Sequence, residues 1–280
     1  MTTNVRSTKS VDVATGRAMS FSDKVVIVTG ASSGIGAATA VLFSHSGARV
    51  VLVGRNQDKL KNVVEKCNKG GTASLAVVAD ISKDSDVEKI FKQTIDTFGK
   101  LDILVNNAGI VVHGSILNGN LLQAYDQTMQ TNMRAVIKLT TLAAPYLIES
   151  KGCIVNVSSI EGKKSSMINH MAYMVSKAAL DHFTRGAALE LAPKGVRVNS
   201  VSPGPVRTDI LENSDIGAGN ITWDDIAKVM ILERVSEPEE TAELILYLAS
   251  EKAKGITGSD FVCDNGALLG TKTSNLSKSL

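Results

Sequence analysis

Short runs rich in apolar and β-branched residues alternate with longer stretches of helical periodicity from Lys24 onward. The expected strands cover residues 25–29, 49–53, 74–79, 103–106, 153–158, 196–201 and 259–263. The expected helices between them cover residues 34–46, 57–69, 84–98, 121–148, 170–191 and 238–250. Because strands and helices alternate, we predict an α/β fold, in which a doubly wound sheet of seven parallel strands carries helices on both faces.

The length of 280 residues suits one large α/β domain and is short for two domains of ordinary size. We expect a single domain over residues 21–270. Residues 1–20 are polar and are expected to form a flexible extension, and residues 271–280 a C-terminal tail. Helical and strand periodicity breaks over residues 205–235, and a segment of this length without periodicity is expected to cover a site.

Composition narrows the class of partner. The net charge is +2, with 44% apolar and 21% charged residues, so a nucleic acid or an anionic membrane is not expected as a partner, and a small molecule is. No apolar run reaches the ~18 residues of a membrane span. Cys67, Cys153 and Cys263 have no metal-ligand spacing and are interpreted as reduced core thiols, which indicates a cytoplasmic location. An organelle transit peptide within residues 1–20 is the alternative.

A glycine-rich turn joins the first expected strand to the first expected helix. It reads Thr-Gly-Ala-Ser-Ser-Gly-Ile-Gly over residues 29–36. Glycines allow a tight turn and a close approach of the backbone to a pyrophosphate, whose charge is favoured at a helix N-terminus. The position of this turn therefore predicts a nucleotide site in a Rossmann-type domain, and a turn with packing duties only is the alternative.

Tyr173 and Lys177 lie four residues apart in an expected helix, so their side chains share one face. A tyrosine is a weak acid at neutral pH unless a neighbouring cation favours its ionised form. We therefore expect Lys177 to lower the pKa of Tyr173 and to make the phenol a proton donor.

The spacing Gly-x-x-x-Gly-x-Gly, the Asn106-Asn107-Ala108-Gly109 block, the Tyr-x-x-x-Lys pair and the Pro203-Gly204 segment together resemble the short-chain dehydrogenase/reductase family. The resemblance covers residues 24–270. It implies an oxidoreductase that transfers a hydride between a nicotinamide dinucleotide and a carbonyl or secondary alcohol. The cofactor-binding residues that it implies are Gly30, Ser32, Ser33, Gly34, Ile35, Gly36, Arg55, Asp80, Asn107, Tyr173, Lys177, Pro203, Val206 and Thr208.

The choice of dinucleotide rests on the end of the second strand, which reads Gly54-Arg55-Asn56. An NAD site usually has a carboxylate here for the ribose hydroxyls, and an NADP site has a cation for the 2′-phosphate. Because Arg55 can form a charge-assisted bond to phosphate, we predict NADP(H) in preference to NAD(H). The alternative is that Arg55 is a solvated surface residue.

The resemblance also implies a catalytic set of Asn132, Ser159, Tyr173 and Lys177. Tyr173 would act as general acid/base and Ser159 would bind the substrate oxygen. Lys177 would bind the nicotinamide ribose, and Asn132 would hold a water chain behind it. Ser158, which precedes Ser159, is expected to point to the opposite face of its strand.

The segment over residues 205–235 would form a substrate lid, and its apolar residues indicate an apolar substrate: Ile210, Leu211, Ile216, Ile221, Trp223 and Met230. His113 and His170 are candidates for lining the same pocket. Lys163 and Lys164 are expected in a solvated loop, and no metal site is expected. A nonenzymatic NADP(H)-binding sensor and a nucleotide-sugar epimerase or dehydratase are the rival functions. The family resemblance implies a homo-oligomer, a tetramer or a dimer, formed through the helices of residues 121–148 and 170–192.

Overall fold

The structure is a computed structural model and describes residues 19–165, 167–209 and 222–270. One parallel sheet of seven strands runs through it in the order β3-β2-β1-β4-β5-β6-β7. The strands are β1 (Val25–Thr29), β2 (Arg49–Gly54), β3 (Ser74–Val78), β4 (Ile103–Asn106), β5 (Cys153–Val157), β6 (Arg197–Pro203) and β7 (Asp260–Cys263). The strand order reverses between β1 and β4, and such a switch point leaves a crevice at the carboxyl ends of the strands.

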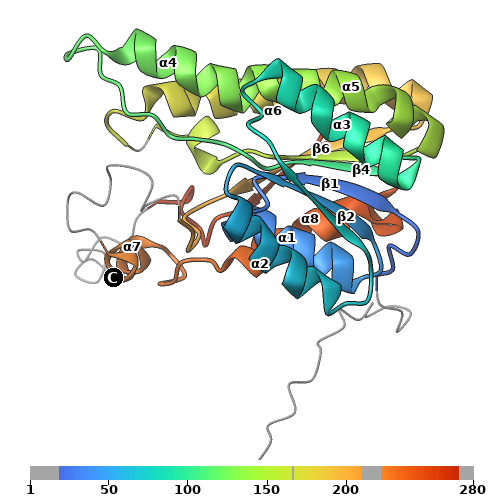
Figure 1. The fold of residues 1–280 in the computed structure, drawn as a ribbon. Coiled ribbons are helices and arrows are strands. Elements are labelled where there is room, and N and C mark those ends of the chain that lie inside the picture. The colour runs from blue at the N-terminus through green and yellow to red at the C-terminus, as the bar shows by residue number, and fades with distance from the viewer. Residues whose placement is uncertain (1–18, 166, 210–221, 271–280) are drawn as a thin grey trace, which may run out of the picture.

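Helices cover both faces of the sheet (Figure 1). On one face lie α1 (Gly34–His45), α2 (Gln57–Asn68) and α8 (Pro238–Ala249). On the other lie α3 (Asp84–Phe98), α4 (Leu121–Met129), α5 (Ala135–Ser150) and α6 (Met171–Leu191). The short α7 (Trp223–Val229) follows the second gap in the described residues.

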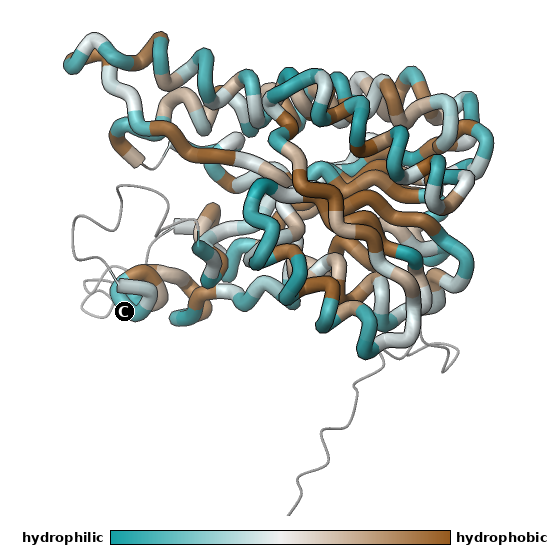
Figure 2. Tube along the Cα trace, viewed as in Figure 1, coloured by the Kyte–Doolittle hydropathy of each residue, from teal (hydrophilic) through white to brown (hydrophobic). Residues whose placement is uncertain are grey.

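Alternate residues of each strand enter two separate hydrophobic cores. Val26 and Val28 of β1 pack toward α1, α2 and α8, and Val25 and Ile27 pack toward α3, α5 and α6. Figure 2 shows the apolar strands in the centre of the molecule, between helices that contain both hydrophilic and hydrophobic residues. Because both faces are covered, β1 is apolar at four of its five positions and has no polar face.

The fold agrees with the prediction from the sequence, but the expected helix of residues 121–148 is divided. Residues Gln130–Arg134 form a π-helical turn, η1, between α4 and α5. The extension expected over residues 1–20 and the tail over residues 271–280 lie outside the described residues, apart from Met19 and Ser20. The same holds for Ile210, Leu211, Ile216 and Ile221 of the expected lid. Within the described residues, no helix is both long enough and apolar enough to span a membrane.

Candidate active site

The glycine turn of residues 30–36 has no room for larger side chains. Gly30 has φ +67°, and a Cβ there would lie 2.8 Å from Asn107 Nδ2. A Cβ on Gly36 would lie 2.3 Å from the carbonyl oxygen of Gly30. Helix α1 starts directly after Ser33, whose side chain does not cap it, and its first turn contains no acidic residue. The turn therefore offers uncapped amide groups to an anion, as a pyrophosphate requires.

Asn107 fixes this turn from the neighbouring strand. Its Nδ2 donates hydrogen bonds to the carbonyl oxygens of Thr29 at 2.8 Å and Gly30 at 3.3 Å. The Thr29 hydroxyl accepts from the backbone N–H groups of Asn107 at 3.0 Å and Ala108 at 3.1 Å. The side-chain amide of Asn107 thus holds the glycine turn in place, and Thr29, which the sequence analysis did not single out, shares this task.

The expected contacts of the dinucleotide gather beside the turn. A Cβ on Gly54 would lie 3.3 Å from Ser32, which brings the end of β2 next to the turn. Arg55 follows and is exposed. Partial burial would raise the pKa of Asp80, but hydrogen bonds from Ser82 and the charges of Arg55 and Lys83 outweigh it and lower the pKa. The Arg55 charge therefore acts across the same edge of the sheet as Asp80.

The segment after β6 closes the other side of the turn. Thr208 packs against Gly34, where a Cβ would lie 2.8 Å from Thr208 Cγ2. Val206 is buried and forms an isolated bridge with Ser236. Pro203 ends β6 and pairs with Cys263 of β7. Residues 203–208 and the glycine turn are thus side by side, although about 170 positions separate them in the chain.

Tyr173 and Lys177 both lie in the first two turns of α6. Lys177 is 4% exposed, and its Nζ donates a hydrogen bond to the carbonyl oxygen of Val157 at 2.8 Å. The same Nζ lies 5.5 Å from the centroid of the Tyr173 ring. Helix α6 and the carboxyl end of β5 therefore meet at this pair.

Burial governs the ionisation of the pair. It raises the pKa of Tyr173 to about 12, against the smaller effect of a hydrogen bond with the Ser159 side chain. It also lowers the pKa of Lys177 to about 8, although the charge of Asp181 opposes the change. The expectation that Lys177 lowers the pKa of Tyr173 is therefore wrong for this structure, because the Lys177 ammonium is directed at the Val157 carbonyl and burial of the phenol dominates.

Ser158 and Ser159 follow β5 and both contact α6, but they make different hydrogen bonds. The Ser158 hydroxyl donates to the backbone carbonyl of Lys177 at 3.3 Å, so this side chain faces the interior of α6. The Ser159 hydroxyl accepts from the backbone N–H of Glu161 at 3.1 Å and shares a hydrogen bond with Tyr173. Of the two serines, Ser159 is the one beside the phenol.

Asn132 lies in the π-helical turn η1. Its Oδ1 accepts from the Ile110 N–H at 2.9 Å, and its Nδ2 donates to the Ile110 carbonyl at 3.0 Å. A Cβ on Gly109 would lie 3.5 Å from Asn132 Oδ1 and 3.6 Å from Lys177 Nζ. Asn132 and Lys177 thus face the same stretch of backbone, and π-helical turns often occur at such functional positions.

Lys163 belongs to a network of charges behind Lys177. Its Nζ lies 2.9 Å from Asp181 Oδ2 and 3.0 Å from Asp260 Oδ2, and it donates to Ser202 Oγ at 2.7 Å. Lys163 is exposed in a loop as expected, but two carboxylates from α6 and β7 hold its ammonium. Asp181 was missed, although it lies four residues after Lys177 on the same helix face.

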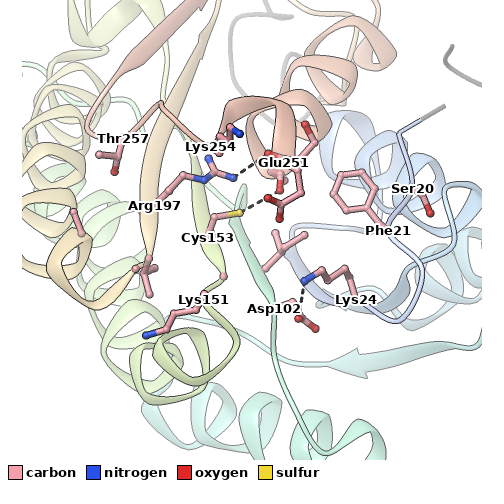
Figure 3. A pocket seen from close by; sticks show the side chains of 17 residues that line it. Ser20, Phe21, Lys24, Asp102, Lys151, Cys153, Arg197, Glu251, Lys254 and Thr257 are labelled. Carbon is pink, nitrogen blue, oxygen red and sulfur yellow. Dashed lines mark hydrogen bonds and ion pairs between the residues drawn. The ribbon is translucent and has the colours of Figure 1, made fainter. Parts of the chain in front are cut away.

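A separate cavity of about 360 Å³ lies at the opposite edge of the sheet, where the strands begin (Figure 3). Two of its cations are engaged within the protein: Lys24 lies 3.4 Å from Asp102, and Arg197 donates to the carbonyl oxygens of Leu248 at 2.7 Å and Ser250 at 3.2 Å. Cys153 on its wall has a pKa raised to about 11 by burial. This cavity is remote from the carboxyl ends of the strands, where the expected site residues gather.

The fold and the glycine turn define a Rossmann-type oxidoreductase domain, and the comparisons identify its family. The family model described as enoyl-(acyl carrier protein) reductase matches residues 30–267. Meso-2,3-butanediol dehydrogenase from Serratia marcescens is 34% identical and aligns with 89% of this chain and 96% of its own length. The A-factor type gamma-butyrolactone 1'-reductase (1S-forming) from Streptomyces virginiae is also 34% identical, over 88% of this chain and 96% of its own length.

A solved structure of a short-chain dehydrogenase/reductase of unknown function from Caenorhabditis elegans, determined with cofactor, superposes with a TM-score of 0.83. Its sequence is 36% identical, over 89% of this chain and 97% of that one. The chain belongs to the short-chain dehydrogenase/reductase family. It is therefore an oxidoreductase of a family that uses a nicotinamide cofactor.

Proposed function

We propose that this protein is an NADP(H)-dependent oxidoreductase that interconverts a carbonyl and a secondary alcohol of a mainly apolar small molecule, with Tyr173 as general acid/base. The main support for this proposal is that Tyr173, Ser159 and Lys177 lie together at the carboxyl end of β5. There, Lys177 Nζ donates a hydrogen bond to the Val157 carbonyl oxygen at 2.8 Å. Open α/β sheets place their sites at this edge.

The glycine turn fits the dinucleotide for two reasons. Its glycines leave free the space that a Cβ would fill, and no side chain caps the N-terminus of α1. Ser32, Ser33 and the amides of Gly34, Ile35 and Gly36 would hold the phosphates. Arg55 would bind the 2′-phosphate of NADP(H), which an exposed guanidinium can reach as a bidentate donor. Asp80 would lie beside the adenine, and Val206 and Thr208 beside the nicotinamide.

When bound, the cofactor supplies or accepts the hydride at the carbonyl carbon. Burial keeps the pKa of Tyr173 at about 12, so the phenol is protonated at neutral pH and can donate its proton to the developing alkoxide. The Ser159 hydroxyl shares a hydrogen bond with the phenol and would bind the same substrate oxygen. In the oxidative direction the tyrosinate would accept the alcohol proton.

Lys177 and Asn132 complete the set. The Lys177 ammonium is fixed one turn from Tyr173, and we propose that it binds the nicotinamide ribose. Asn132 is a positioning residue, because its amide binds the Ile110 backbone through both Oδ1 and Nδ2. We propose that Asn132 holds water that returns the proton from solvent to Lys177.

Apolar side chains near the expected lid support an apolar substrate. Met230 is buried with Ile160 and Ala267, which lie directly after the carboxyl ends of β5 and β7. Met167, Ile168 and Met171, which precede or begin α6, are exposed. We propose that these side chains contact the apolar part of the substrate.

We also propose a homo-oligomer formed through α4, α5 and α6. These helices expose large apolar side chains, among them Leu122 at 70% and Leu189 at 81% exposure. Association would bury them. Light scattering on the protein as it elutes from a size-exclusion column would give a mass of two or four chains, and a mass of one chain would contradict this part of the proposal.

The reducing compartment that the cysteine thiols imply supports a cytoplasmic location.

The proposal is tested by NADPH oxidation with a panel of apolar ketones and aldehydes, by the reverse assay on the matching alcohols, and by dissociation constants for NADPH and NADH. We expect turnover of at least one apolar ketone and tighter binding of NADPH. NADPH binding with no oxidation by any carbonyl would instead support the nonenzymatic sensor. Tighter binding of NADH would contradict the assignment of Arg55.

A further inference from the structure

Two histidines from distant parts of the chain are in direct contact near α6. The rings of His113 and His170 have centroids 4.8 Å apart and planes inclined by 62°, an edge-on arrangement. The backbone fixes this contact, because the Gly114 N–H donates to the Asn169 carbonyl at 3.0 Å and Gly114 bridges His170. Backbone pairing between the two segments therefore holds the two imidazoles together.

The pair lies beside the proposed reaction centre. His170 is the N-cap residue of α6, just outside its helical turns, and lies three residues before Tyr173. His113 lies four residues after Gly109, whose backbone is next to Asn132 and Lys177. The segment after β4 thus runs from the catalytic lysine to the first turn of α6.

One nitrogen of the pair has no partner. His113 Nε2 is buried and makes no hydrogen bond. A buried polar atom without a hydrogen-bond partner is destabilising. A bound ligand that supplies the missing hydrogen bond would remove this cost. His170 is 3% exposed, and burial, together with the neighbouring His113, lowers its pKa. Both effects disfavour the charged form of His170.

We propose that His113, held by His170, binds a second, neutral oxygen of the substrate, a hydroxyl or a carbonyl. This inference rests on the proposed function. A neutral imidazole nitrogen either donates to a carbonyl or accepts from a hydroxyl, so both groups satisfy Nε2. A carboxylate fits less well, because it requires a protonated ring in a buried pair. The substrate class is thereby narrowed from any apolar ketone to a hydroxyketone, diketone or corresponding diol.

The first test compares two probes that differ by one oxygen, 3-hydroxy-2-butanone and 2-butanone, in NADPH oxidation. We expect kcat/KM to be about tenfold or more higher for the hydroxyketone. The variant His113→Phe keeps a ring beside His170 but has no nitrogen, so this preference should fall to about one. The matched control is His182→Phe, at an exposed site on α6, which should keep the preference. An unchanged preference in His113→Phe would overturn the inference.

The second test does not depend on turnover. Tyr173→Phe protein labelled with ¹⁵N-histidine and saturated with NADPH is titrated with each probe, and His113 is assigned through His113→Phe. The hydroxyketone should shift the His113 ring nitrogens and 2-butanone should not. Equal shifts with both probes, or none, would overturn the inference even if the wild-type protein reduces ketones. A selective shift in a protein that reduces neither probe would contradict the proposed function and leave this site standing.

Discussion

The buried ammonium of Lys177 donates a hydrogen bond to the carbonyl oxygen of Val157, with Nζ and O 2.8 Å apart. This bond connects α6 to the end of β5 and fixes the position of the Lys177 charge. Without it, a side chain with four rotatable bonds would have many positions. The position of the charge relative to Tyr173 therefore depends on the packing of α6 against the sheet.

Tyr173→Phe removes the proposed proton donor and little else. We expect turnover to fall by about 10³-fold or more, because the alkoxide would have to take its proton from water. The dissociation constant for NADPH, measured by fluorescence, should change by less than about threefold. The matched control is Tyr247→Phe, on α8, which should retain wild-type turnover. Substantial activity in Tyr173→Phe would falsify the assignment of the general acid.

Lys177→Met should change how stability depends on pH. Burial lowers the folded-state pKa of Lys177 to about 8 from 10.5. Between these two values the unfolded chain binds the proton and the folded protein does not, so raising the pH disfavours unfolding. From pH 7 to pH 10 the wild-type protein should therefore gain roughly 2 kcal/mol of unfolding free energy relative to Lys177→Met.

Urea titrations at several pH values measure this difference between the two proteins. Lys92→Met is the control, because its side chain is 76% exposed and pairs with Asp96 at the surface. Its stability relative to the wild type should be nearly independent of pH over the same range. A parallel pH dependence in the wild type and Lys177→Met would show that burial does not depress the pKa of Lys177.

Arg55→Gln tests the cofactor preference. If the guanidinium binds the 2′-phosphate, its loss should weaken NADPH binding by about 10- to 100-fold and leave NADH binding nearly unchanged. Lys61→Gln provides a matched loss of charge on α2, where the side chain is 61% exposed, and should not change the preference. Isothermal titration of the wild type and both variants with each dinucleotide gives the dissociation constants needed. Equal weakening of both dinucleotides would contradict the role of Arg55.

Gly36→Ala tests the tightness of the glycine turn. The added Cβ would lie 2.3 Å from the Gly30 carbonyl and 2.5 Å from Asn107 Nδ2, so the backbone of the turn must shift. We expect a loss of about 1–3 kcal/mol of stability and much weaker NADPH binding. Gly186→Ala, inside α6 with nothing within 4 Å of its Cβ, should be neutral or stabilise by up to about 1 kcal/mol. Thermal unfolding and NADPH titration of both variants would separate these outcomes.

Several elements were predictable because their causes are local. Strands β1 and β4 and helix α3 have the expected bounds, since apolar runs and helical periodicity are read within a few residues. The role of Lys163 was not predictable, because the carboxylates that hold it come from residues 181 and 260.

The sequence by itself determined the family, the doubly wound sheet and the types of residue at the candidate site, because these are encoded in short motifs and in periodicity. Only the tertiary structure decided the ionisation of Tyr173 and Lys177, the π-helical setting of Asn132, the packing of Thr208 against Gly34 and the contact of His113 with His170. Each of these depends on burial or on an approach between residues far apart in the chain. Desolvation and close packing arise only when the elements have assembled.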